Sequence, residues 1–254
     1  MHLDENLDTF LHFSVDDVID GLLEVSDAGI PFSEHPLFGF LDGLNKRFGI
    51  HVDLYLFYRS ASRGKLRLLS DVSSDLRAQF SARPWLRLGP HALDYETPPH
   101  AQTEEDCRQT LSTILHEIDR FAGFEQRSQW LRLHYFSEPY EMAEFLIDNG
   151  MSTLLLTDKP QGAYRLPENL RCDLIRRGFV SHKGLRLQRS HTRMEFLVNE
   201  CGSTQALRDR LDHLLLKHGN LVLFTHAVDL ANEEVRTTTV KCLEYLHEIG
   251  LASI

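Results

Sequence analysis

Two adjacent carboxylates, Asp16 and Asp17, follow a short apolar segment near the start of the chain. Neighbouring carboxylates repel each other, so one of their pKa values should rise unless a cation neutralises the pair. A divalent metal bound by one aspartate and by neutral imidazoles would do so, and it would leave the other aspartate to act as a general base towards water. The alternative is that one of the two only caps the helix that begins near Val18.

Three histidines, His91, His134 and His226, occupy the corresponding place after other apolar segments. A single histidine on a strand is more often a hydrogen-bonded core residue than a ligand. In parallel α/β folds, however, functional residues gather where the strands end and the loops begin. The three histidines at predicted strand ends, together with the aspartate pair, therefore predict a polar functional cluster.

Further polar residues lie close to these segments. Arg193 stands between His191 and Glu195, and the three side chains share a face if this segment is a strand. A cross-strand ion pair is the favoured interpretation, and contact with the cleft is the alternative. Asp229 follows His226 by three residues and is the nearest acid in sequence that could raise the pKa of that histidine.

Three aromatic residues, Tyr95, Trp130 and Tyr135, lie near the predicted mouth of the cluster and could stack on a sugar ring. Aromatic residues close to strands are nevertheless more often part of the core. His12 lies inside the first predicted strand, and its parity with Asp16 points both side chains to the same side. His12 could therefore support the cluster by a hydrogen bond.

The elements that must position these residues alternate between strands and helices. Strands are predicted at Leu11–Val15, Ile50–Tyr58, Trp85–Leu88, Trp130–Tyr135, Thr153–Thr157, Gly184–Gln188, Met194–Val198 and Asn220–Thr225. Helices are predicted at Val18–Val25, Pro36–Arg47, Ser74–Ser81, Glu104–Phe121, Pro139–Asn149, Ser203–Lys217 and Asn232–Ile249. Most strands are continuously apolar, which favours a parallel sheet covered on both faces. The alternation predicts βαβ units in an α/β barrel, complete or incomplete, or in a doubly wound sheet.

The organisation of the chain is that of an ordinary globular protein. Its 254 residues are 42% hydrophobic and contain no linker-like tract and no internal repeat. We therefore expect residues 1–254 to form a single domain. Gly162–Asn169 and Arg176–Arg193 are expected to form an irregular insertion or a small antiparallel piece.

Composition and missing motifs exclude several classes of function. A net charge of −10 argues against nucleic acid or an anionic membrane as the partner. No apolar stretch reaches the roughly 18 residues of a membrane span. The acidic N-terminus does not resemble a secretory signal, and the four cysteines are scattered without a CxxC pair, so a cytoplasmic protein with reduced thiols is expected. Glycine-rich phosphate loops and a GxSxG nucleophile motif are absent.

Taken in order, these segments resemble the motifs of the polysaccharide deacetylases, the carbohydrate esterase family 4 enzymes. Ser14-Val15-Asp16-Asp17 resembles the Thr-Phe-Asp-Asp motif of that family, and Leu223-Phe224-Thr225-His226 is similar to its Leu-x-His motif. Gly89-Pro90-His91-Ala92-Leu93-Asp94 falls where the family has its His-x-x-x-His motif, and His134 falls where it has Arg-x-Pro. The resemblance covers nearly the whole chain, roughly residues 10 to 249.

The resemblance implies a fold and a set of roles. The fold is a distorted (β/α) barrel with parallel strands and outer helices. Asp16 is implied to be the general base and His226 the general acid. Asp17 and His91 are implied to hold a divalent metal ion, with zinc as the first choice and cobalt, nickel or manganese as alternatives. His134, or else Asp94, is expected to help them as a further ligand.

The sequence also departs from the family pattern. Tyr95 stands four positions after His91, where the family has its second metal histidine. Asp94, His100 or His134 could replace it. The later Asp-x-x-Asp-Trp motif of the family has no counterpart, so a divergent member is expected.

The function implied is a metal-dependent hydrolase that removes an acyl group from a carbohydrate or a related small amide. It would cleave a carbon–nitrogen bond other than a peptide bond. The alternative is a catalytically inactive barrel of the same type that binds a carbohydrate or a protein partner. An unrelated metal-dependent α/β hydrolase with converging residues is a third interpretation. The sequence does not predict the substrate or the oligomeric state.

Overall fold

The strands of the computed structural model, which describes residues 9–61, 64–159 and 165–254, form two sheets and a small hairpin. The larger sheet is parallel and runs in the order β10 (Thr192–Arg193), β11 (Leu221–His226), β1 (Leu11–Asp16), β2 (Val52–Phe57) and β5 (Leu86–Ala92). The second sheet runs in the order β6 (Trp130–Arg132), β7 (Thr153–Leu156), β9 (Leu185–Arg189) and β8 (Phe179–His182). The hairpin consists of β3 (Arg59–Ser60) and β4 (Arg67–Leu68).

The two sheets are connected at two places, by a backbone hydrogen bond at one and by the chain itself at the other. Just before β6, the N–H of Ser128 donates to the carbonyl of Leu88 in β5 at 2.7 Å. At the other border only Ser190 and His191 separate β9 from β10. The N–H of Ser190 donates to a carbonyl of β7, and that of His191 donates to a carbonyl of β11. The two sheets therefore follow one another round a barrel, and the predicted distorted (β/α) barrel is confirmed.

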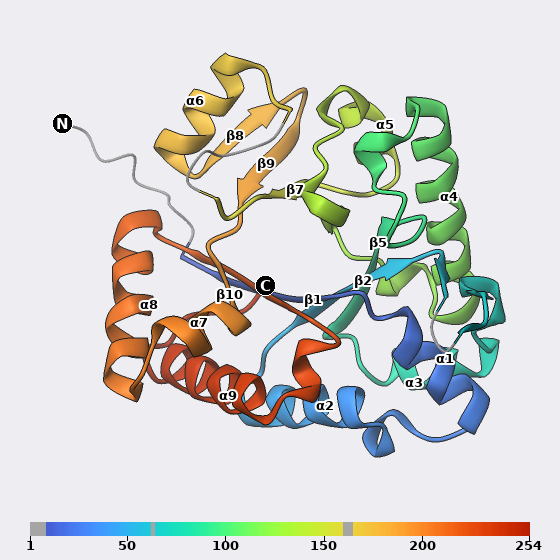
Figure 1. Cartoon of the computed structure of the whole chain (residues 1–254), viewed down its shortest axis with the longest axis horizontal. Coiled ribbons are helices and arrows are strands. Elements are labelled where there is room, and N and C mark those ends of the chain that lie inside the picture. Colours follow the sequence, from blue (N-terminus) through green and yellow to red (C-terminus); the bar gives the residue numbers. More distant parts are fainter. Residues whose placement is uncertain (1–8, 62–63, 160–164) are drawn as a thin grey trace.

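The helices lie outside the strands, as Figure 1 shows. They are α1 (Ile19–Ala28), α2 (Pro36–Phe48), α3 (Arg77–Ser81), α4 (Glu104–Phe121), α5 (Ala143–Asp148), α6 (Glu168–Arg177), α7 (Met194–Glu200), α8 (Thr204–His218) and α9 (Glu233–Glu248). The N-terminus of α4 is capped, because Thr103 Oγ1 accepts the N–H of Asp106 at 3.1 Å. Within the described residues, none of these helices combines the length and apolar character needed to span a bilayer.

The strands that carry the predicted site are buried on both faces. Every residue of β1 and β2 is buried. The continuous apolar runs in the sequence predicted this burial, because they are typical of strands covered on both faces. Polar side chains also lie inside the barrel. His12 and Ser128 both hydrogen bond to Asp53 Oδ2, at 2.9 and 2.7 Å. This contact directs His12 to Asp53 and not to the aspartate pair that it was expected to support.

The predicted strand Met194–Val198 is wrong, because these residues begin α7. Met194 and Leu197 are buried at helical spacing, and Phe196 between them is exposed. Helix α6 was not predicted. Of the expected irregular segment Gly162–Asn169, residues 162–164 lie outside the described part of the chain. The small antiparallel piece expected within Arg176–Arg193 is present, since β8 pairs with β9 in antiparallel fashion.

Candidate active site

The two aspartates lie at the end of β1, and each contacts a different partner. Asp16 is the last residue of β1 and is buried, with its Oδ1 3.3 Å from Nη1 of Arg132. Asp17 follows with a left-handed backbone (φ 63°), a conformation that is uncommon outside glycine and more frequent for aspartate. Helix α1 has no side-chain cap, so the interpretation that one of the aspartates only caps this helix is wrong.

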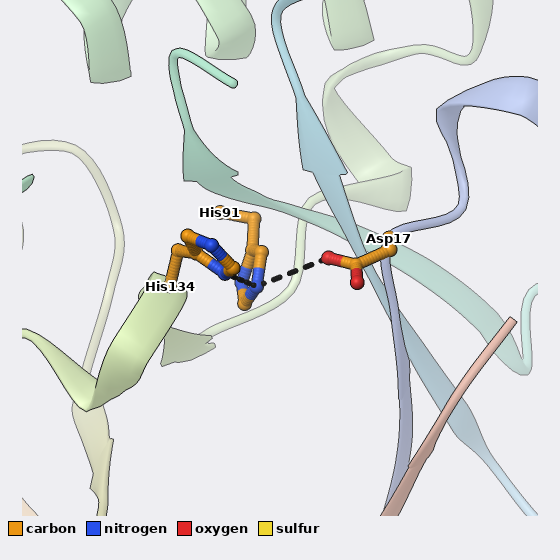
Figure 2. Close-up of side chains that lie close together, drawn as sticks. All are labelled: Asp17, His91 and His134. Carbon is orange, nitrogen blue, oxygen red and sulfur yellow. Dashed lines mark hydrogen bonds and ion pairs between the residues drawn. The ribbon is translucent and has the colours of Figure 1, made fainter. Parts of the chain in front are cut away.

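His91 presents one ring nitrogen to Asp17. Its Nδ1 lies 2.7 Å from the carbonyl oxygen of Arg132 and must donate a proton to it, so the neutral ring has its lone pair on Nε2. Nε2 lies 3.4 Å from Oδ1 of Asp17 (Figure 2). Burial lowers the pKa of His91 to about 4, although the charge of Asp16 acts in the opposite direction. The ring is therefore neutral at physiological pH.

His134 faces the same point from the next strand of the barrel. It follows β6 by two residues, and its Nε2 lies 3.1 Å from the carbonyl oxygen of Tyr95, to which it donates. Its Nδ1 lies 3.3 Å from Nε2 of His91. Burial lowers the pKa of His134 as well. The next two residues, Tyr135 and Phe136, both have positive φ angles of about 50°, a strain that is most often found at functional sites.

Asp17, His91 and His134 therefore converge as three acceptors. Their ligand atoms all lie within 4.8 Å of one another, and the carboxylate points towards the two rings in Figure 2. Both imidazole protons are used on backbone carbonyls, so no proton remains to bridge the two facing nitrogens. Asp17 Oδ1 is buried without a hydrogen-bond partner, and burial together with Asp16 raises the pKa of Asp17 to about 7. Two imidazoles and one carboxylate are a common catalytic zinc ligand set, which keeps positions for water. The residues fit a divalent metal.

The other predicted ligands lie apart from this group. Asp94 is held by Arg59, with Oδ2 2.6 Å from Nε. His100 lies 2.9 Å from the hydroxyl of Ser137. Arg193 forms an ion pair with Asp158 at 3.4 Å, not with the other residues of its own segment. Of the three replacements considered for the missing family histidine, the structure brings only His134 to His91.

Arg132 is a residue of the site that sequence reasoning missed. It is 1% exposed, and its Nη1 donates to Ser14 Oγ at 2.8 Å and lies 3.3 Å from Asp16 Oδ1. Its guanidinium also stacks 3.8 Å over the ring of Phe224. The sequence does contain a feature that could have identified it: Arg132 is a charged residue within an apolar segment, two residues before His134.

His226 lies beside Asp16, because the two residues pair in register between β11 and β1. Its Nδ1 is 3.1 Å from Asp229 Oδ2 and 3.2 Å from Glu195 Oε1. The expected partner Asp229 is therefore confirmed. Glu195 was missed as a partner because its segment was predicted to be a strand. Glu195 also accepts from Thr225 Oγ1 at 3.3 Å.

The carboxylates around His226 keep it protonated. Burial by itself lowers the pKa of His226, but the hydrogen bond to Glu195 and the charges of Asp16, Glu195 and Asp17 outweigh it and raise the pKa to about 9. The atoms of Glu195, His226 and Asp229 are also close enough to share a cation. At neutral pH, however, a proton occupies Nδ1 of His226. The ring is then an imidazolium that can donate from Nε2.

Two hollows lie near these residues, one at Asp17 and the other at the residues that follow His134. The larger, of about 890 Å³, begins at Asp17 and passes Phe57 and Tyr95. The smaller, of about 420 Å³, is lined by Tyr135 and Phe136. Tyr95 and Tyr135 are 56% and 50% exposed, and their ring centres are 6.1 Å apart, so these two predicted aromatics are accessible at the mouth. Trp130 instead begins β6 and packs on the buried His12, with ring centres 4.7 Å apart.

No protein-family model matches this sequence, and a search of curated proteins finds no significant match either. The fold does have relatives among solved structures. A peptidoglycan N-acetylglucosamine deacetylase matches with a TM-score of 0.56 and 10% identity, over 98% of this chain and 87% of its own. The similarity to an allantoinase has a TM-score of 0.55 and 12% identity, over 99% and 88% of the two chains.

A third relative is a carbohydrate esterase family 4 pseudoenzyme from Bacillus anthracis. It matches with a TM-score of 0.52 and 10% identity, over 98% of this chain and 64% of its own. At such identities the likeness concerns the fold, and it agrees with the order of motifs read from the sequence. The chain therefore has the distorted (β/α) barrel of the polysaccharide deacetylases, in a divergent form.

Proposed function

We propose that this protein is a metal-dependent hydrolase that removes an acyl group from a nitrogen of a carbohydrate or a related small amide. The observation that carries the proposal is the meeting of Asp17 Oδ1, His91 Nε2 and His134 Nδ1, three acceptor atoms without a proton between the rings. Asp16 precedes Asp17, and His226 pairs with Asp16 in register on the neighbouring strand, so these two residues are the candidates for the base and the acid.

Asp17, His91 and His134 would hold the metal, with zinc as the first choice. A cation bound there would polarise the acyl carbonyl and lower the pKa of water. Asp16 is the proton acceptor for that water. The guanidinium of Arg132, 3.3 Å from its Oδ1, orients the buried carboxylate.

His226 is the proton donor to the leaving nitrogen. Glu195 and Asp229 both accept from its Nδ1, which fixes the ring and leaves the Nε2 proton for transfer. A general acid of this kind typically contributes about 10²–10⁴-fold to the rate. A cytoplasmic location is also part of the proposal. None of the four cysteines forms a disulfide, which agrees with a reducing compartment.

The experiment is metal analysis combined with an amide-hydrolysis assay on the full chain. We expect one zinc or cobalt ion per chain, a higher melting temperature on metal addition, and release of acetate from N-acetylated amines or sugars. Asp17→Asn should lose the metal, and Asp16→Asn should keep the metal and lose the activity. His213→Gln, an exposed histidine on α8, is the matched control and should change neither.

The inactive alternative predicts a different result. The replacement of the second family histidine by Tyr95 favours it, as does the pseudoenzyme among the relatives of the fold. A protein that binds its carbohydrate or partner equally well as wild type and as Asp16→Asn, without hydrolysis in either form, would be a binding module. A protein with no metal at unit stoichiometry would contradict the proposed hydrolase.

A further inference from the structure

The larger hollow, of about 890 Å³, adjoins the proposed proton donor. It begins at Asp17, and it is also lined by Ala227 and Val228, which directly follow His226 in the chain. In hydrolysis of an amide the carbon–nitrogen bond breaks: the hydroxyl of water goes to the acyl carbon, and a proton goes from His226 to the nitrogen. The half of the substrate that carries the nitrogen, the amine half, therefore lies on the side of His226. The larger hollow, the amine-side cleft, is then its binding site.

The walls of the amine-side cleft are largely apolar. Phe57 lies at its inner end, with its ring 5.1 Å from that of His91. Leu66 and Val228 line it further out and are 59% and 74% exposed. Exposed apolar side chains grouped around one cavity are typical of a ligand surface, and covering them with hydrocarbon is favourable. The volume and the apolar walls are those of a pocket for a small molecule.

Most charged side chains of the cleft are engaged with one another or with the backbone. Nε2 of His35 lies 3.1 Å from Glu24 Oε2, and both residues line the cleft. Nε of Arg59 lies 2.6 Å from Asp94 Oδ2, and this pair lines the cleft as well. Arg236 donates from Nε and Nη2 to backbone carbonyls. The polar atoms of these side chains are therefore already used within the protein.

Apart from the metal ligand, the other polar side chains of the cleft offer little to a sugar. Asp20 and Ser60 also interact within the protein, Thr97 hydrogen bonds to Asp94, and Glu96 is exposed to water. A sugar ring brings several hydroxyl groups, and each of them costs free energy when it leaves water without a hydrogen-bond partner. Among the described lining residues, the side chains that could act as partners are largely engaged. The cleft is therefore unfavourable for a polyhydroxylated chain.

We propose that the amine half of the substrate is an alkyl or aryl group with few hydroxyls, bound in the amine-side cleft by burial of its hydrocarbon. This inference rests on the proposed function, and it selects a small amide over a carbohydrate as the substrate. The reacting amide lies at Asp17, and the hydrocarbon extends from its nitrogen past Phe57 towards Leu66 and Val228. A sugar in the same cleft is the outcome that the test must exclude.

Two matched amides test the preference for hydrocarbon. N-cyclohexylacetamide and N-acetylglucosamine both carry an acetamido group on a six-membered ring, and only the second carries hydroxyls. We expect kcat/KM to be at least about tenfold higher for the cyclohexyl compound. Along the series N-butyl-, N-hexyl- and N-octylacetamide, kcat/KM should rise by up to about fourfold per added methylene until the cleft is filled. An equal or higher kcat/KM for the sugar, or no dependence on chain length, would overturn the inference.

The double variant Leu66→Asp/Val228→Asp replaces two exposed apolar side chains of the cleft, so we expect the fold to remain intact. KM for N-octylacetamide should rise about tenfold, because the variant removes apolar surface that the hydrocarbon covers. Leu216→Asp, at a 90% exposed position on α8 outside the cleft, is the matched control and should leave KM unchanged. An unchanged KM in the double variant at an unchanged melting temperature would contradict the cleft assignment.

A binding measurement separates this inference from the proposed hydrolase. N-phenyl-1-naphthylamine is an uncharged probe that becomes fluorescent in apolar surroundings, and its binding to Asp16→Asn, with or without zinc, needs no turnover. We expect N-octylacetamide to displace the probe, di-N-acetylchitobiose to leave it bound, and the double variant to bind it about tenfold more weakly. The inference is contradicted if the probe does not bind, if N-octylacetamide does not displace it, or if the chitobiose does. Absent hydrolysis with retained displacement contradicts only the enzyme.

Discussion

Nε2 of His91 and Nδ1 of His134 face each other at 3.3 Å, and each ring donates its only proton to a backbone carbonyl on the far side. Two lone pairs at this distance repel each other unless a cation lies between them. The carbonyl partners belong to Arg132 and Tyr95, so the backbone itself selects the tautomers that a metal needs.

His134→Ala should therefore abolish tight metal binding. We expect affinity to fall by more than the roughly 10–100-fold that loss of a ligand's outer hydrogen-bond partner costs. Equilibrium dialysis against a metal buffer, followed by elemental analysis, measures this affinity. Because the ring of Tyr95 lies 5.1 Å from that of His134, the double variant His134→Ala/Tyr95→His should recover part of the affinity. His100→Ala is the control, and equal metal affinity in His134→Ala would remove His134 from the ligand set.

His226→Ala should keep the metal and lower kcat by about 10²–10⁴-fold. Glu195→Gln should act more mildly, because Asp229 still accepts from Nδ1. The loss of one negative neighbour lowers the pKa of His226, so the alkaline limb of the kcat profile should move to lower pH, with kcat kept on the acid side. The pH dependence of both variants checks this. Metal loss in His226→Ala would make this histidine a ligand instead of the acid.

The raised pKa of His226 also predicts a pH dependence of stability in the metal-free protein. Its pKa is about 9 in the folded chain and 6.5 ordinarily, so the protonated ring stabilises the folded state fully below pH 6.5. This contribution is lost as the pH rises from 6.5 through 9, and amounts to about 3 kcal/mol at most. Urea unfolding of wild type and His226→Gln from pH 6 to 10 measures it. Parallel curves for the two proteins would contradict the prediction.

Arg132→Met should destabilise the protein by about 3–5 kcal/mol, because it leaves Asp16 as a buried carboxylate without its cation. The double variant Arg132→Met/Asp16→Asn should recover much of this loss, since the uncompensated charge is gone. Denaturant unfolding of the two single variants and the double variant gives the coupling energy. Additive effects would mean that the 3.3 Å contact is not an important ion pair.

Local patterns in the sequence were sufficient to predict an α/β fold and the meeting of Asp17, His91 and His134. The choice of a barrel over a doubly wound sheet depended on the resemblance to the polysaccharide deacetylases. Four of the strands, β1, β5, β6 and β11, have an aspartate or a histidine at or near their ends. Parallel strands bring such ends together whatever the distances along the chain. Asp17 and His91 were therefore correctly predicted to lie close together, although they are 74 residues apart in the sequence.

The contacts that were missed depend on three-dimensional packing. Met194–Val198 has the residues of a strand, but burial of Met194 and Leu197 against the core is satisfied by a helix, and this turns Glu195 towards His226. Arg132 reaches Ser14 and Asp16 across the barrel interior. No periodicity in the sequence records which strand a buried arginine faces.

The proposed ligands come from both sheets of the barrel. Asp17 directly follows β1 and His91 lies in β5, both strands of the five-stranded sheet, whereas His134 follows β6 of the other sheet. A cation bound by all three would link the two sheets at the border between β5 and β6. By mass action, a metal at 100 times its dissociation constant would add about 2.7 kcal/mol to the unfolding free energy. This increment would oppose separation of the two sheets, so hydrogen exchange at Ser128, whose N–H joins β5 to the segment before β6, should slow on metal loading.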